Sequence, residues 1–229
     1  MNELLWVSML LVNFGAILIS YRIWGKTGLY LWIPVAVIVA NIQVTKTVEL
    51  FGFTATLGNI VYATSFLVTD ILSENYGKKD AARAVGMGFF ALIMMTILMN
   101  LALFFIPDSS DFAQGSLSTI FSLMPRIALG SLAAYGFSQL HDIWAYDFWR
   151  NKFPSVKFIW LRNNLSTMVS QLLDTLIFTI IAFWGVFENS VLIDIMITTY
   201  LLKWIVALLD TPFIYIARGW HDKRLVDNI

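Results

Sequence analysis

Long apolar runs, separated by short polar connections, occupy nearly the whole chain. A helix needs roughly 20 mainly apolar residues to cross the hydrocarbon core of a bilayer, and seven runs meet that requirement. The sequence therefore predicts an all-α fold, a polytopic membrane helix bundle of six to seven transmembrane helices, with residues 1–229 forming a single domain. The predicted spans are residues 4–21, 29–48, 55–74, 82–106, 117–143, 164–187 and 191–217.

The third run, residues 55–74, is the weakest of these spans because glycine and short polar side chains interrupt it. Irregular backbone is tolerated at membrane depth only where protein or a water-filled cavity surrounds it. If the third run is broken or re-entrant, the bundle has six full spans, and the third run is then of special interest. The interrupting residues are Thr54, Thr56, Gly58, Asn59, Thr64 and Ser65.

Basic residues outside the spans sort into alternate connections, whereas the intervening connections carry only acidic charges. Cytoplasmic loops of membrane proteins are enriched in Lys and Arg. The pattern predicts an N-terminus outside and a C-terminus in the cytoplasm, which fits an odd number of spans. The basic connections contain Arg22 and Lys26; Lys78, Lys79 and Arg83; Arg150, Lys152, Lys157 and Arg162; and Arg218, Lys223 and Arg224.

Composition narrows the class of protein further. Hydrophobic residues make up 59% of the chain and charged residues 13%, whereas a soluble domain has about a quarter of its residues charged. The 15 basic and 15 acidic residues cancel, so bulk charge offers no attraction for nucleic acid. Without Cys, and with two His, the chain lacks the means for thiolate sites or a histidine-built metal centre, and no cofactor is expected. It also lacks nucleotide-binding and zinc-hydrolase motifs, which favours a transporter or substrate-binding component over an enzyme.

Polar side chains inside the predicted spans follow helical stripes. An ionisable group at bilayer depth costs from ~2.5 kcal/mol upward, so such groups normally face the bundle interior. The pattern Ser-Gln-Leu-x-Asp occurs in both the fifth and the sixth spans, at residues 138–142 and 170–174. On antiparallel neighbouring helices these two groups could form two walls of one site. The stripes are Asn59, Phe66 and Asp70; Tyr135, Gln139 and Asp142; and Asn164, Gln171 and Asp174.

Purely structural roles explain some of these residues equally well. Buried amides often join helices through hydrogen bonds of about 1 kcal/mol or less. Asp142 and Asp174 could form salt bridges with Arg126, Lys203 or a loop base, and Lys203 and Asp210 share one helix face.

Four segments carry a pattern that points to a known family. They are residues 59–80 (NIVYATSFLVTDILSENYGKKD); Pro125-Arg126-Ile127-Ala128 with Ser131 to Tyr135; Ser138-Gln139 with Asp142; and Arg162-Asn163-Asn164-Leu165-Ser166-Thr167 with Gln171 and Asp174-Thr175. In these segments the chain resembles the bacterial queuosine precursor transporter family, also called the vitamin uptake transporter family. The match runs from about residue 35 to 215. This family is similar, more distantly, to the substrate-binding components of energy-coupling-factor transporters.

The resemblance implies a multi-pass importer in the bacterial inner membrane for the 7-deazaguanines preQ0 and preQ1, which are salvaged for tRNA queuosine. The alternative is a substrate-binding membrane component for another vitamin-like solute that works with an energising partner. A guanine-like edge has two adjacent donors that one carboxylate can accept, and its flat ring can stack on aromatic side chains. The expected partners are the deazapurine and the lipid bilayer. The candidate substrate-binding residues are Asn59, Phe66, Asp70, Glu74, Arg126, Tyr135, Gln139, Asp142, Asn164, Gln171 and Asp174.

Overall fold

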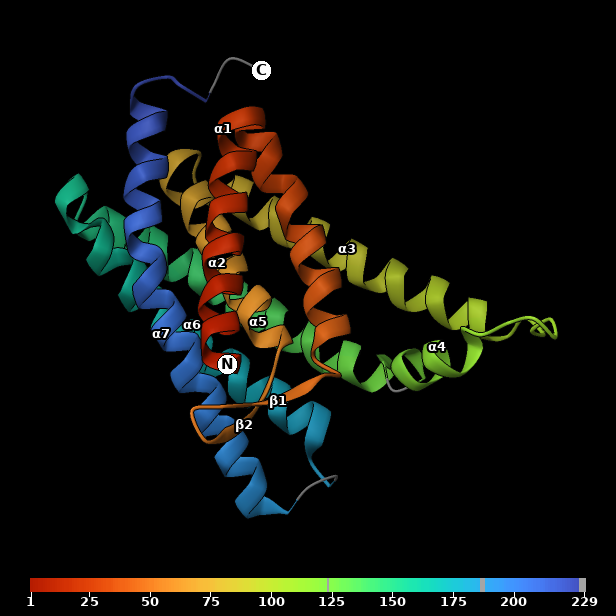
Figure 1. The fold of residues 1–229 in the computed structure, drawn as a ribbon. Helices are drawn as coiled ribbons and strands as arrows, with labels where there is room; N and C mark the ends of the chain where they lie inside the picture. The colour runs from red at the N-terminus through yellow and green to blue at the C-terminus, as the bar shows by residue number, and fades with distance from the viewer. Residues whose placement is uncertain (123, 186–187, 227–229) are drawn as a thin grey trace.

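The first helix, α1 (Asn2–Gln43), is a helical hairpin. A computed structural model describes residues 1–122, 124–185 and 188–226 of the chain. In it the backbone of α1 kinks at Gly25, whose φ of 55° and ψ of −137° are open to glycine, and the chain then runs back beside itself (Figure 1). A Cβ atom added to Gly28 would lie 2.1 Å from the carbonyl oxygen of Ser20. Glycine at position 28 therefore allows the two arms to approach closely.

A short β-hairpin follows α1. Strands β1 (Thr47–Leu50) and β2 (Phe53–Thr56) pair antiparallel, with Thr47 opposite Thr56 and Leu50 opposite Phe53. The turn between them has positive φ at Phe51 (53°) and Gly52 (81°). The adjoining ends of the predicted spans 29–48 and 55–74 fall in this hairpin, in strands rather than in helix. The physical reason is that the β-branched residues of this stretch favour strands and that its Gly-containing turn reverses the chain.

Helix α2 (Gly58–Asn75) lies in the centre of the bundle, packed against α1, α3, α5 and α7. It is a continuous helix, and nearly all its residues are buried. The small and polar residues that weaken this run in the sequence are therefore explained by its position. Small side chains let helices approach closely, and polar ones form bonds between helices.

The remaining helices surround α2. Helix α5 (Met124–Lys152) packs along α6 (Ile159–Phe183), and α6 packs in turn on α7 (Asn189–Asp222). Helices α3 (Lys78–Leu103) and α4 (Gln114–Phe121) project from the bundle on one side (Figure 1). A short 3-10 helix, η1 (Val156–Phe158), joins α5 to α6.

Many large apolar side chains lie on the outside of the bundle. Phe90, Leu98, Trp144 and Ile197 are each more than 45% exposed, as expected for side chains that face lipid. Among the described residues, five helical segments are long and apolar enough to cross a membrane, and the first of these contains both arms of α1. The chain is thus a multi-pass, all-α membrane protein. The exact span boundaries stay a prediction.

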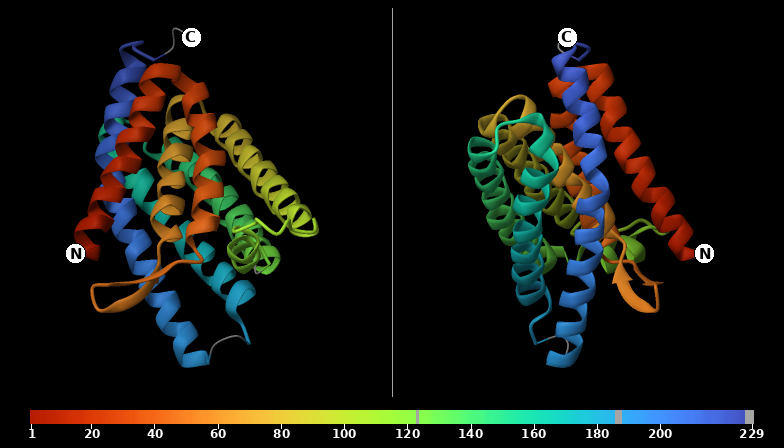
Figure 2. Two further views of the ribbon diagram at one scale, coloured as in Figure 1. Left: turned by 45° about the vertical axis from the view of Figure 1, so that its right-hand side comes forward. Right: turned by 90° about the vertical axis from the view of Figure 1, so that its left-hand side faces the viewer.

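The basic connections meet at one end of the bundle, here called the basic end. The kink of α1, the α2–α3 turn and the end of α7 lie there, whereas the β-hairpin lies at the other end (Figure 2). The side-chain amide of Asn2 donates to the carbonyl of Glu49 (3.0 Å), which places the N-terminus beside the hairpin. The N-terminus and the end of α7 therefore lie toward opposite ends. Contacts at the basic end are Lys26–Asp80 (3.1 Å), Lys78–Asp147 (3.1 Å), and Arg150 to the carbonyl of Ser73 (2.5 Å).

Candidate functional site

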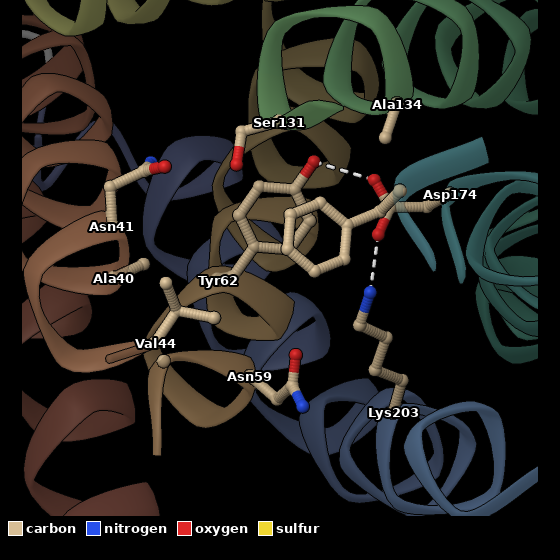
Figure 3. Close-up of a pocket in the computed structure, with 11 residues that line it drawn as sticks. Ala40, Asn41, Val44, Asn59, Tyr62, Ser131, Ala134, Asp174 and Lys203 are labelled. Carbon is tan, nitrogen blue, oxygen red and sulfur yellow. Dashed lines mark hydrogen bonds and ion pairs between the residues drawn. The ribbon is translucent and has the colours of Figure 1, made fainter. Parts of the chain in front are cut away.

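A cavity with an empty volume of about 340 Å³ lies between the second arm of α1 and helices α2, α5, α6 and α7. Tyr62 crosses the cavity, with Asp174 and Lys203 on one side and Asn41 on the other (Figure 3). The polar lining consists of Asn41, Asn59, Tyr62, Ser131, Asp174 and Lys203, and the apolar lining of Ala40, Val44, Gly58, Ala134 and Phe178.

A buried ion pair forms one wall of this cavity. One carboxylate oxygen of Asp174 contacts the ammonium group of Lys203. The other oxygen accepts hydrogen bonds from the hydroxyls of Tyr62 (2.6 Å) and Ser138 (3.2 Å). Asp174 is 1% exposed and Lys203 3% exposed. A buried pair is tolerated where such additional hydrogen bonds offset its desolvation. The sequence named Lys203 as a possible partner of Asp174 but did not include it in the candidate site.

The ring of Tyr62, which lines the cavity, belongs to an aromatic cluster. The ring of Tyr62 meets that of Tyr135 edge to face, with centroids 5.6 Å apart, and that of Phe66 at 6.2 Å. The ammonium group of Lys203 lies 5.1 Å from the centroid of the Tyr62 ring. The sequence analysis missed Tyr62. Its spacing of four and eight residues before Phe66 and Asp70 was the signal that could have revealed it.

The buried amides lie next along the helices, one turn deeper than the ion pair. Gln139 accepts a hydrogen bond from Thr69 (3.1 Å) and donates one to Ser65 (3.4 Å), so it links α5 to α2. Gln171 is completely buried, and within the described structure neither of its amide atoms has a hydrogen-bond partner. Gln139 on α5 and Gln171 on α6 therefore do face the interior.

Three carboxyl groups, called here the carboxylate layer, lie deeper still. They belong to Asp70, Asp142 and Asp210, all completely buried. The hydroxyl of Thr167 donates to Asp70 (3.3 Å), and the amide of Asn163 donates to Asp210 (2.8 Å). Four helices, α2, α5, α6 and α7, contribute side chains to this layer.

A second buried ion pair closes the interior at the basic end, and we call it the inner clamp. The guanidinium of Arg162 lies 2.6 Å from the carboxylate of Glu74 and also donates to the carbonyls of Phe153 (2.8 Å) and Ser155 (3.1 Å). Tyr146 donates to the same carboxylate (3.1 Å), and Arg218 lies 3.8 Å from it.

These layers form one polar column through the bundle, from the cavity to the basic end. Successive layers are about one helical turn apart, roughly 5.4 Å, as the spacing of Phe66, Asp70 and Glu74 on α2 illustrates. The column contains hydrogen-bond donors and acceptors suited to a small polar ligand. Within the described residues, no three His, Asp or Glu side chains are arranged to hold a metal ion.

The structure places two candidate residues outside the column. Arg126 is exposed and donates to the carbonyls of Ile181 (3.1 Å) and Trp184 (2.7 Å), near the end of α6. Arg126 therefore caps the end of α6 instead of pairing with Asp174, because the last carbonyls of a helix lack partners within it.

Asn164 is the second such residue. It donates to the carbonyl of Trp160 (2.7 Å) and to the hydroxyl of Thr211 (3.1 Å), at the α6–α7 contact. Its neighbour Asn163 is the completely buried amide that reaches the carboxylate layer. Asn163 comes four residues before Thr167, so it lies closer than Asn164 to the face of α6 that meets the carboxylate layer.

An apolar bundle with a buried polar column and an internal cavity is the arrangement expected of a small-solute membrane transporter. Comparison with known proteins specifies the family. The family model described as "Putative vitamin uptake transporter" matches residues 56–217. The chain belongs to this transporter family, and the protein is a multi-pass membrane transporter rather than an enzyme.

Two curated relatives agree with this assignment. The chain is 48% identical over 227 residues to the "Probable queuosine precursor transporter" of Bacillus subtilis (strain 168), covering 99% of this chain and 97% of the relative. It is 26% identical over 196 residues to the "Queuosine precursor transporter" of Escherichia coli (strain K12), covering 82% and 84% respectively. No solved structure matches the chain significantly.

Proposed function

We propose that this protein imports queuosine precursors, the 7-deazaguanines preQ0 and preQ1, and binds them in the cavity beside Asp174 and Lys203. The names of both relatives support the class of substrate. The observation that carries the choice of site is the buried Asp174–Lys203 pair, which borders the cavity together with the Tyr62 ring. A charged pair next to an aromatic ring matches a flat, polar heterocycle.

The recognition chemistry follows from the groups that line the cavity. A guanine-like edge has an N–H and an exocyclic amine side by side, which the carboxylate of Asp174 can accept as a pair. The neighbouring oxygen of the same edge is an acceptor, and Lys203 supplies a donor next to Asp174. The bicyclic ring can stack on Tyr62 or Phe178, and Asn41 offers an amide at the opposite wall and Asn59 another near Lys203.

The other candidate residues have different places in this proposal. Phe66 and Tyr135 support the Tyr62 ring, and Gln139 and Gln171 lie one turn deeper, where a substrate would pass after leaving the cavity. Asp70, Asp142 and Glu74 lie below them, and Arg126 and Asn164 lie outside the path. Substrate recognition is thus assigned mainly to Asn59, Tyr62, Asp174 and Lys203.

We place the protein in the bacterial inner membrane, with the N-terminus outside and the basic end in the cytoplasm. The clustering of basic connections at one end supports this orientation. Val44, Gly58 and Asn59 line the cavity next to the β-hairpin, so the cavity is nearer the outer side. The inner clamp then closes the cytoplasmic side, as a carrier ready to accept substrate from outside requires. Reporters fused to the two termini test the orientation, and reporters on the same side would contradict it.

Uptake of labelled preQ1 into liposomes that contain this protein alone tests the proposed function. We expect saturable uptake, competed by unlabelled preQ0 and unaffected by Asp108→Asn, which changes an exposed loop carboxylate. Binding without uptake would favour the alternative, a binding component that needs an energising partner. The absence of both binding and uptake would contradict the proposed substrate class.

A further inference from the structure

The carboxylate layer brings three completely buried carboxyl groups together. The carboxyl groups of Asp70 and Asp142 contact each other, and Asp210 interacts electrostatically with both. Moving one ionised carboxylate from water into a protein interior costs several kcal/mol. Adjacent carboxylates add repulsion, so one of a contacting pair normally holds a proton. Three ionised groups are therefore not stable here without added positive charge.

The bases near the layer are already engaged with other acids. Lys203 of α7 pairs with Asp174, and Arg162 of α6 and Arg218 of α7 face Glu74. No Lys or Arg of the described chain forms an ion pair with a member of the layer. Of the other titratable groups on the surrounding helices, Tyr146 and His141 of α5 bond Glu74 and Ser170, and Lys26 of α1 pairs with Asp80 of α3 at the basic end.

A shortage of hydrogen-bond donors is the independent sign of a missing ligand. The amide oxygen of Asn163 is buried beside Asp210 and has no donor in the described structure. Both carboxylate oxygens of Asp142, one of Asp70 and one of Asp210 also lack donors there. Buried acceptors nearly always have a donor. Such a group of buried acceptors without donors indicates that a proton belongs in the layer.

The nearby hydroxyls are engaged mainly with other acceptors. Ser166, Thr167 and Ser170 lie beside Asp142. Their hydrogens go elsewhere: Ser166 donates to the carbonyl of Asn163 (3.2 Å), Thr167 to Asp70 (3.3 Å), and Ser170 to the carbonyl of Ser166 (2.9 Å). These hydroxyls therefore donate to acceptors within α6 or to Asp70.

We infer that the carboxylate layer is a proton-binding site in which Asp70 and Asp142 share one proton, and that this proton moves inward with the substrate. The coupling part rests on the proposed function, whereas the bound proton does not. The proton forms one O–H bond to a carboxylate oxygen when it enters from outside water, and it returns to water on the inner side. No other bond changes.

The position of the layer between the cavity and the inner clamp explains how proton movement and substrate movement would be linked. Thr69, the neighbour of Asp70, bonds Gln139, and Gln139 lies one turn from the Asp174 level of the column. On the other side, Tyr146 donates to Glu74 of the inner clamp and interacts electrostatically with Asp70 of the layer. Because protonation removes a negative charge between the cavity and the clamp, it lowers the cost of opening the column to substrate.

Infrared difference spectroscopy on the purified full-length protein tests the bound proton directly. We expect a protonated-carboxyl band at neutral pH in the wild type and in Asp108→Asn, and its marked reduction in the Asp70→Asn/Asp142→Asn double variant. Each single variant is measured as well, in case the double variant does not fold. A wild-type spectrum without a protonated-carboxyl band overturns the proposal.

Transport of labelled preQ1 into proteoliposomes tests the coupling. An imposed gradient, acidic outside, should raise wild-type uptake several-fold, whereas a sodium gradient should not. Asp142→Asn should lose the response to the pH gradient but keep exchange of internal for external preQ1 within about twofold of wild type.

Uptake that follows sodium, or that ignores the pH gradient, overturns the coupling. Loss of exchange in Asp142→Asn also overturns it and assigns Asp142 to substrate binding. If the wild type shows no exchange, the proposed function fails, while the infrared result still decides the bound proton.

Discussion

Two buried ion pairs lie at opposite ends of the polar column, and their surroundings differ. Around Glu74, the guanidinium of Arg162 also binds two backbone carbonyls, and Tyr146 and Arg218 add further contacts. Asp174 and Lys203, by contrast, border the cavity. A pair whose donors hold the backbone together acts mainly on the fold, whereas a pair beside open space is free to exchange a contact for a ligand. The residue types alone would not separate these roles.

The largest expected effect in this comparison is that of Arg162→Gln. Removing one partner of a buried pair leaves an uncompensated charge, here Glu74, at a cost of ~3–5 kcal/mol. Two carbonyls near the start of α6 also lose their donor. We expect a large drop in the melting temperature in detergent and low yield. Adding Glu74→Gln should recover part of the loss, and wild-type melting of the single variant would show that the clamp is not structural.

Asp174→Asn should act chiefly on the ligand. The substitution keeps the shape but presents a donor to the two donors of the substrate edge, so we expect affinity for preQ1 to fall by about tenfold or more, or ~1.4 kcal/mol per decade. Ligand binding and ligand-free melting are measured on the same preparation. Lowered melting with unchanged affinity would make this pair structural, like the inner clamp. A double-mutant cycle with Lys203→Met separates the two contributions, because contacting residues couple.

Tyr62→Phe tests the contact between ring and ion pair with a smaller change. It removes the hydroxyl that donates to Asp174 at 2.6 Å but retains the ring. A hydrogen bond to a charged group contributes about 1.5–3 kcal/mol, shared here between folding and ligand binding, so a several-fold loss of affinity is expected. Tyr62→Leu should lose more if the ring stacks on the substrate. Equal affinities of the two variants would argue against stacking.

Arg126→Gln should have the smallest effect. This side chain is exposed and caps the end of α6, so its contribution to stability should be about 1 kcal/mol or less. Affinity for preQ1 and uptake should match the wild type. A tenfold loss of affinity would return Arg126 to the substrate site, where the sequence had placed it.

The buried stripes show how far helical spacing alone could go. Gln139 with Asp142, and Gln171 with Asp174, are interior residues as predicted, because polar groups in an apolar span must avoid lipid. Spacing could not separate Asn163 from Asn164, since both lie near the stripe and the choice depends on the rotation of α6 against α7. Nor could it show that Lys203 rather than Arg126 meets Asp174. That contact depends on how three helices pack.

The class of structure, an all-α membrane bundle with a polar interior, follows from hydrophobic length and charge position, because the bilayer imposes them on every span. The family follows from the motifs, which match the vitamin uptake transporters. The tertiary structure alone decided the partners of the buried charges, the hairpin between α1 and α2, and the order of layers along the column. These features depend on contacts between residues far apart in the chain, and on which groups can satisfy one another once water is excluded.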